Sequence, residues 1–121
     1  MLNCLLVGLG GFIGAVLRYL ISLIPIKNPE SFPVNTFVIN IVGAFAIGCI
    51  AFVVSKDKNI DPKLLLFLKV GICGGFTTFS TFSLETAELI KSGSVVTALI
   101  YVLASVVLSV LAVMLPQLVL K

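Results

Sequence analysis

Four long apolar stretches separated by short polar segments limit what this chain can fold into. The stretches cover residues 2–24, 33–55, 63–89 and 94–120. At ~1.5 Å of rise per residue, each is long enough as a helix to cross the ~30 Å hydrocarbon core of a bilayer. The chain has 121 residues in all, so little remains for a water-soluble domain. We therefore predict an all-α integral membrane protein whose residues 1–121 form a single domain of four transmembrane helices.

The composition agrees with a membrane protein and argues against several classes of function. Hydrophobic residues make up 60% of the chain and charged residues 11%, whereas about a quarter of an ordinary soluble domain is charged. The basic residues are scattered over the loops, so the net charge of +3 does not indicate a nucleic-acid partner. The chain has no His and only five acidic residues, which leaves few groups for acid–base or metal-dependent catalysis. We therefore do not expect an enzyme.

Two features within the apolar stretches admit a second interpretation. The first stretch resembles a signal sequence in hydrophobicity, but it has no basic segment at its start and carries Arg18 inside it. We interpret it as a helix that is retained. Cys4, Cys49 and Cys73 are odd in number and widely spaced, so we interpret them as packing residues rather than as a disulfide or a metal site.

Small residues recur four positions apart in three of the stretches. This spacing lets neighbouring helices approach closely in lipid, where no hydrophobic force drives helices together. The pairs are Gly10 with Gly14, Gly11 with Ala15, Ala44 with Gly48, and Gly71 with Gly75. The first run also resembles a nucleotide-binding glycine motif, but the position of its last glycine is occupied by Ile13. We therefore predict that these residues pack helices together.

Polar side chains form stripes on two other stretches. Thr36 and Asn40 are four residues apart, and Tyr101, Ser105 and Ser109 continue the same spacing elsewhere, so each set shares one helical face. A hydroxyl in a membrane helix often bonds its own helix or a neighbour, and that alternative remains open for each residue. Taken together, the stripes favour a hydrated pathway.

The segment "GGFTTFSTFS", residues 74–83, lies near the middle of the third stretch. Two glycines followed by Phe and two β-branched Thr are poor material for a continuous helix. A break at this depth frees backbone carbonyls, which must be satisfied by protein, water or an ion. Phe79 and Phe82 share a face and could present their positive ring edges to a dehydrated anion, although ordinary core packing explains their spacing as well. We predict a helix break with an ion-binding role.

The charge distribution sets the orientation only weakly. Four spans place both termini and the 55–63 segment on one side, where five basic residues lie against three on the other. The first group is Lys56, Lys58, Lys63, Lys69 and Lys121, and the second is Arg18, Lys27 and Lys91. Single and dual orientation both remain open. Four packed helices have an interior filled by side chains, so we expect an aqueous path to need a second copy. In an inverted pair, the two breaks would meet on the symmetry axis, where carbonyls could hold a small hard cation.

Three motifs together resemble one known family. They are "GGFIGAVLRY" in the first stretch, "NTFVINIVGAFAIG" in the second and "GGFTTFSTFSLE" in the third. In this order they closely resemble the bacterial Fluc (CrcB) fluoride channels, and the likeness extends over all four stretches. The resemblance implies a dual-topology antiparallel homodimer in the cell membrane, with a buried sodium ion at its centre. It also implies two pores that pass fluoride passively and thereby export it from the cytoplasm.

The resemblance also implies roles for individual residues. Phe79, Phe82 and Asn40 match the family's pore residues, and the backbone carbonyls of Gly74 and Thr77 match its sodium site. The polar track would consist of Thr36, Ser80, Thr81, Tyr101, Ser105 and Ser109, and which hydroxyls of the third stretch face the pore is left open. Arg18 and Glu85 would lie in the vestibule, with a surface or interhelix ion pair as the alternative.

Two other functions are compatible with four short spans. A small multidrug-resistance-type exporter couples protons through a membrane-embedded Glu on its first span, but here that span has Arg18 and no acidic residue. A structural subunit would use its polar stripes only to pack against a partner. A fluoride flux measurement separates both alternatives from a channel.

Overall fold

The computed structural model describes residues 1–25 and 32–120, and these residues form helices joined by short connections. The polar segment predicted at 25–32 therefore lies almost wholly outside the described residues, as do Lys27 and Lys121 of the charge comparison. Within the described part, the order is α1 (Leu2–Ser22), α2 (Val34–Lys56), α3 (Pro62–Leu65), η1 (Leu66–Cys73), α4 (Gly74–Phe76), α5 (Phe79–Lys91) and α6 (Val95–Val119).

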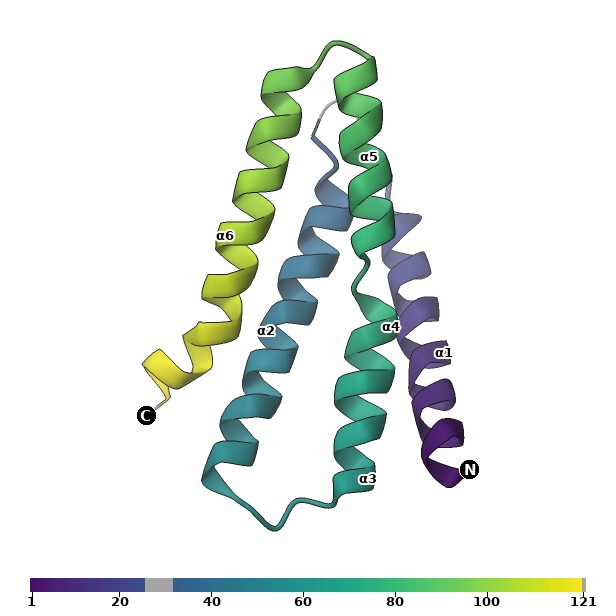
Figure 1. Cartoon of the computed structure of the whole chain (residues 1–121), viewed down its shortest axis with the longest axis vertical. Helices are drawn as coiled ribbons and strands as arrows, with labels where there is room; N and C mark the ends of the chain where they lie inside the picture. The colour runs from purple at the N-terminus through teal and green to yellow at the C-terminus, as the bar shows by residue number, and fades with distance from the viewer. Residues whose placement is uncertain (26–31, 121) are drawn as a thin grey trace.

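Four spans are long and apolar enough to cross a membrane in the described residues, which confirms the predicted all-α membrane architecture. They are α1, α2, the combined segment Pro62–Lys91 and α6. Each predicted range agrees with the observed helix to within a few residues. The N-terminus, the connection between α2 and α3, and the end of α6 all lie toward one end of the molecule, and the connection between α5 and α6 lies at the other (Figure 1).

The third span is broken in its middle, as predicted. Thr77 (φ −81°, ψ 156°) and Thr78 (φ −147°, ψ 118°) are extended and separate α4 from α5. The break does not fall on the glycines, however, because Gly74 and Gly75 are still helical. Figure 1 shows the thin connection between α4 and α5. The two Thr residues therefore provide the break, whereas the glycines precede it.

A second irregularity precedes the break and was not predicted from the sequence. Residues Leu66–Cys73 form a π-helix, η1, whose hydrogen bonds span one residue more than in an α-helix. The Gly74 N–H at its end donates to the carbonyls of Gly71 and Lys69. Hydrophobic periodicity does not distinguish a wide turn from a normal one, so the sequence carries no signal for it.

Glycines determine how α1 packs on the third span. Gly10 lies against the backbone of Phe67 and Gly71, and a side-chain Cβ on Gly75 would lie 2.6 Å from the carbonyl oxygen of Gly11. Gly48 similarly lets α2 approach the backbone of α6 at Val113. The predicted packing role is confirmed for the glycines of these pairs, whereas Ala44 lines a cavity and the role of Ala15 stays a prediction. Accordingly, α1 packs mainly on η1 and α4, and α2 packs mainly on α6.

Little of the apolar surface is buried within one copy of the chain. Of the 18 most apolar consecutive residues in each span, at most 22% are buried within the chain. The buried hydrophobic residues among those described are few, and they are Ile39, Cys73, Phe76, Leu89, Ala98 and Tyr101. The remaining apolar faces need lipid or another protein surface to cover them.

Candidate pore site at the helix break

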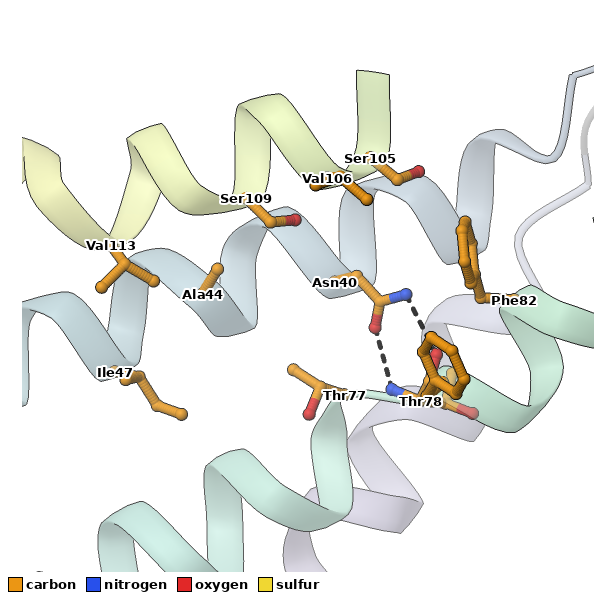
Figure 2. Close-up of a pocket in the computed structure, with 11 residues that line it drawn as sticks. Asn40, Ala44, Ile47, Thr77, Thr78, Phe82, Ser105, Val106, Ser109 and Val113 are labelled. Carbon is orange, nitrogen blue, oxygen red and sulfur yellow. Dashed lines mark hydrogen bonds between the residues drawn. The ribbon is translucent and has the colours of Figure 1, made fainter. Parts of the chain in front are cut away.

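Asn40 on α2 holds the broken segment by two hydrogen bonds to a single residue. Its Oδ1 accepts from the Thr78 N–H at 2.8 Å, and its Nδ2 donates to the Thr78 carbonyl at 3.1 Å. Figure 2 shows both bonds side by side. A side-chain amide can replace a peptide partner in this way because it carries both a donor and an acceptor. Asn40 therefore satisfies the backbone where the helix can no longer do so.

Three further hydrogen bonds complete the break. The Thr78 Oγ1 accepts from the Thr81 N–H at 3.1 Å and so caps the start of α5. The Thr77 hydroxyl donates to the Cys73 carbonyl at 3.0 Å, within the preceding turn. On the side of α1, the Arg18 Nε donates to the Gly75 carbonyl at 3.1 Å. The extended segment is thus held from α1, from α2 and by its own side chains.

The carbonyls of Gly74 and Thr77 are among those that lose their helical donors at this point. In an unbroken helix, the Thr78 N–H would bond to the Gly74 carbonyl and the Thr81 N–H to the Thr77 carbonyl. Both N–H groups are instead taken by side chains, Asn40 and Thr78 respectively. Gly74 is also exposed on the surface of the chain. The carbonyl oxygens of Gly74 and Thr77 are therefore among those that the break releases, and their binding of a cation stays a prediction.

A groove of about 360 Å³ runs between α2, α6 and the break. Its lining is Asn40, Ala44, Ile47, Thr77, Thr78, Phe79, Phe82, Ser105, Val106, Ser109 and Val113. Figure 2 shows the hydroxyls of α6 facing the Asn40 side of the groove, with Phe82 toward one end and Ile47 and Val113 toward the other. The tertiary structure therefore brings one member of the α2 stripe, two members of the α6 stripe and both predicted aromatic residues to one groove.

Ser105 is the lining residue whose polar group is least satisfied. Its side chain is 7% exposed, and its Oγ has no hydrogen-bond partner among the described residues. A buried hydroxyl without a partner is costly unless water or an ion completes it. Ser105 is thus a free donor at the edge of the groove.

The aromatic side chains continue from the groove into the chain. The ring centroids of Phe79 and Phe82 are 5.7 Å apart with the rings tilted by 43°, and those of Phe82 and Tyr101 are 5.0 Å apart. Phe79 is 79% exposed, whereas Tyr101 is fully buried. The row of rings therefore leads from the surface of this chain to its core.

Glu85 lies beyond this row and accepts hydrogen bonds from two of the predicted track hydroxyls. Its Oε2 accepts from the Thr36 Oγ1 at 3.0 Å, and its Oε1 accepts from the Tyr101 hydroxyl at 2.8 Å. Glu85 and Thr36, together with Thr81 and Asn35, line a second hollow of about 410 Å³ beside the end of α1. Glu85 is thus tied to α2 and α6 rather than to Arg18, which bonds the Gly75 carbonyl.

Most of the predicted site residues line one of the two hollows. Asn40, Thr77, Phe79, Phe82, Ser105 and Ser109 line the groove, whereas Thr36, Thr81 and Glu85 line the second hollow. Tyr101 is buried between them and contacts both Phe82 and Glu85. Ser80 lines neither cavity, and its Oγ lies 3.4 Å from the Thr78 Oγ1 on the exposed side of α5.

For two polar residues near the site, the sequence did not predict the contacts that the structure shows. Asn35 donates through its Nδ2 to the carbonyls of Ile21 and Ile24, both at 3.0 Å, and so ties the start of α2 to the end of α1. Glu85 was expected in a vestibule but bonds two hydroxyls inside the chain. Neither arrangement has a sequence signal, because both depend on which helices become neighbours.

Side-chain metal ligands do not gather anywhere in the described residues. No group of three or more Cys, Asp or Glu side chains is placed to hold a metal ion there, and the three cysteines are free thiols. A cation bound by this part of the chain would therefore need backbone or hydroxyl oxygens. Such ligands suit a hard cation.

Comparison with known proteins gives a consistent result. Residues 5–117 match the family described as CrcB-like protein, Camphor Resistance (CrcB). A protein of Ruminiclostridium cellulolyticum is 43% identical over 122 residues, covering 100% of this chain and 94% of the relative. Proteins of Phocaeicola vulgatus (44% identical, 95% of each chain) and Azobacteroides pseudotrichonymphae (41%, with 91% of this chain and 89% of the relative) are similar too. All three relatives carry the name fluoride-specific ion channel FluC.

Proposed function

Since the chain belongs to the CrcB family, we propose that it is a fluoride-selective passive channel. One observation supports this proposal most. The groove at the break combines an anchored amide, two phenylalanines and an unpartnered buried hydroxyl, and its remaining lining is mostly apolar. The relatives are named as channels rather than enzymes. The chain itself is a multi-pass protein of the bacterial cell membrane.

The proposed mechanism begins with an anion that sheds water as it enters the groove. The ring edges of Phe79 and Phe82 carry positive potential and can face an anion without a formal charge. Ser105 can donate its free hydroxyl, and Ser109 lies one turn further along α6. Fixed donors in a narrow path of low polarity favour a small anion that forms strong hydrogen bonds, which is a basis for selectivity.

Asn40 has a narrower part in this mechanism than the sequence predicted. Its Oδ1 and one Nδ2 hydrogen are engaged with Thr78. Only the second Nδ2 hydrogen is left to donate to an anion. We propose that Asn40 mainly fixes the position of the break and offers this one remaining donor to fluoride.

The hydroxyls near Glu85 serve the far part of the path. Thr36 and Tyr101 direct their hydrogens to the Glu85 carboxylate. A passing anion must therefore compete with a carboxylate for these donors, which keeps its binding weak enough for release. The second hollow, lined by Thr81 and Glu85, provides space next to them. We propose that Thr36, Thr81 and Tyr101 continue the fluoride path and that Glu85 lies near its mouth, whereas Arg18, which bonds the Gly75 carbonyl and lines neither hollow, lies outside it.

We propose that two inverted copies form the functional unit, with two pores. The large exposed apolar surface and the 79% exposure of Phe79 support a protein partner in addition to lipid. The groove opens at the surface of this chain, where Phe79 is exposed, and in this proposal a second copy closes it into a pore. An antiparallel pair places the break of one chain opposite the break of the other.

A structural sodium ion fits the residues present at the break. The carbonyls of Gly74 and Thr77 have lost their helical donors, and oxygen ligands suit a small hard cation. Held by these two carbonyls from each copy, sodium would neutralise the partial negative charges of the half-helix ends. The fluoride path itself does not depend on a step at this ion. Export from the cytoplasm follows if fluoride accumulates there and moves down its gradient.

The decisive test is ion flux through purified protein in liposomes. We expect fluoride efflux when a potential is imposed and at most slow chloride efflux under the same conditions. Comparable chloride flux would contradict a fluoride-selective channel. Proton-coupled export of an organic cation would favour the multidrug-type alternative, which the absence of an acidic residue in α1 already disfavours. The absence of flux for all of these ions would favour a structural subunit.

A further inference from the structure

Arg18 makes a contact that neither the charge pattern nor a vestibule position explains. Its side chain is half-buried, and its Nε donates to the Gly75 carbonyl at 3.1 Å. Gly75 lies two residues before the extended Thr77, and 57 positions along the chain from Arg18. The contact therefore joins α1 to the last turn of the half-helix that ends at the break.

We infer that Arg18 is a positioning residue that holds the break in the third span, and that it does so through the Nε hydrogen bond rather than through its charge. The break is part of the proposed fluoride path, so the flux part of this inference rests on the proposed function. The structural part rests only on the contact between α1 and α4.

The Gly75 carbonyl needs such a donor. In a continuous helix it would accept from the N–H of Phe79, but the extended Thr77 and Thr78 interrupt that register. Backbone groups at the end of a half-helix inside a membrane are tolerated only where protein or water satisfies them. Arg18 supplies the donor from outside the third span. Without it, the carbonyl could be satisfied by closing the helix again, which would remove the extended segment.

Close packing holds the donor in place. Gly14 precedes Arg18 by one turn on the same face of α1, and a Cβ on Gly14 would lie 2.8 Å from the Phe76 nitrogen and 3.1 Å from the Gly75 carbonyl carbon. The backbone of α1 is therefore in contact with the end of α4 directly below Arg18. This packing keeps the Arg18 donor close to the Gly75 carbonyl.

Arg18 and Asn40 act on opposite sides of the same segment. Asn40 reaches from α2 and binds both peptide groups of Thr78, and Arg18 reaches from α1 and binds Gly75. The released carbonyl of Thr77 lies between these two anchors, and that of Gly74 directly precedes them. Two side chains from separate helices thus hold the backbone next to both released oxygens.

Three substitutions separate the donor from the charge. Arg18→Gln places its Nε2 the same number of bonds from Cα as the Arg Nε, so it keeps the donor and removes the charge. Arg18→Met places a methyl group at that atom and removes both. Arg18→Lys keeps the charge but has a methylene at that atom. Lys69→Gln, which removes an exposed cation from η1, is the matched control for loss of charge.

The readouts are fluoride efflux from liposomes and hydrogen exchange over residues 74–82 of the same reconstituted protein. We expect Arg18→Gln and Lys69→Gln to stay within about twofold of the original chain, as surface-like changes do. Arg18→Met and Arg18→Lys should lower flux by about tenfold, the scale of a buried carbonyl left without its donor, and should alter exchange over the broken segment.

Other outcomes overturn the inference. Normal fluoride flux and normal hydrogen exchange in Arg18→Met would show that the Arg18–Gly75 bond does not keep the broken segment in place. Normal behaviour of Arg18→Lys with equal losses in Arg18→Gln and Arg18→Met would assign the role to charge. Failure of Arg18→Gln to assemble would also contradict it, whereas failure of Arg18→Met alone supports it. If the original chain passes no fluoride, the proposed function fails, and the exchange data still decide the role of Arg18.

Discussion

The third span has two sides that differ in how they meet their neighbours. Toward α1 it is sealed by glycines, with Gly75 so close to Gly11 that a single added carbon would lie 2.6 Å from its carbonyl oxygen. Toward α2 and α6 it is open, and a groove of about 360 Å³ remains. One span can therefore be anchored on one side and offer polar groups on the other. The difference comes from side-chain size: glycine lets backbones touch, whereas Asn, Ser and Phe keep them apart.

The largest expected effect comes from adding volume to the sealed side. A Cβ at Gly14 would collide with the backbone of Ile72 and Phe76, neither of which is the end of a flexible side chain. We expect Gly14→Ala to destabilise the fold by roughly 3 kcal/mol, the upper range for an overfilled contact. Thermal unfolding in detergent, followed by size-exclusion chromatography, measures this change.

Gly8→Ala is the matched control, because a Cβ at Gly8 would meet nothing within 4 Å. It should leave the unfolding temperature unchanged or slightly higher, since Ala is the better helix former. Equal behaviour of the two variants would show that α1 is not sealed against the third span.

The next largest effect tests the anchor on the open side. Asn40→Asp keeps the acceptor for the Thr78 N–H but removes the donor to the Thr78 carbonyl and adds a negative charge beside an anion path. We expect fluoride flux to fall by about thirtyfold, the equivalent of ~2 kcal/mol for a buried carbonyl left without its partner. Liposome efflux measures the change.

Asn59→Asp makes the same chemical change in the exposed connection between α2 and α3 and should not alter flux. The proposed dimer should persist in both variants, as judged by size-exclusion chromatography. Undiminished flux in Asn40→Asp would separate Asn40 from the path.

Ser105 provides a test in which stability and flux should move in opposite directions. Its Oγ is buried and has no partner in the described part of the chain. Ser105→Ala should therefore leave the free energy of unfolding the same or raise it slightly, because an unsatisfied group is removed. Flux should fall by about fivefold if the hydroxyl donates to the anion, the effect of one neutral hydrogen bond. A fall in stability with unchanged flux would indicate that the hydroxyl has a structural partner instead.

The smallest effect is expected at Ser80. Its hydroxyl contacts Thr78 and lines neither cavity of the described chain. Ser80→Ala should change flux by less than about twofold, as exposed substitutions usually do. A loss as large as that of Ser105→Ala would place Ser80 in the path, which would then require a surface that only a second copy completes.

The architecture and the break were predictable because they depend on local properties. Long apolar stretches have one stable form in a bilayer, since every backbone group must be satisfied within the segment. The Thr pair at 77 and 78 and the stripes on α2 and α6 could be read from the sequence alone, and one groove is lined by Asn40, Thr77, Thr78, Ser105 and Ser109. The roles of the site residues in fluoride conduction stay predictions until flux is measured.

Other features could not be predicted, because they depend on which segments become neighbours. The helical state of Gly74 and Gly75 follows from the hydrogen bonds of η1 and from the contact with α1. The partners of Glu85 lie 49 positions before it and 16 positions after it in the chain, and nothing in the spacing connects these three residues. The same holds for Asn35, which satisfies the end of a different helix.

The sequence by itself determined that this chain spans a membrane four times and that its third span cannot remain helical throughout. These outcomes follow from hydrophobicity and from local backbone preferences, which act over a few residues. Only the tertiary structure decided which polar groups satisfy the break and which are left free. Arg18 and Asn40 take the backbone groups of Gly75 and Thr78, and Ser105 keeps an open hydroxyl, because hydrogen bonding inside a membrane is settled by the distance between helices.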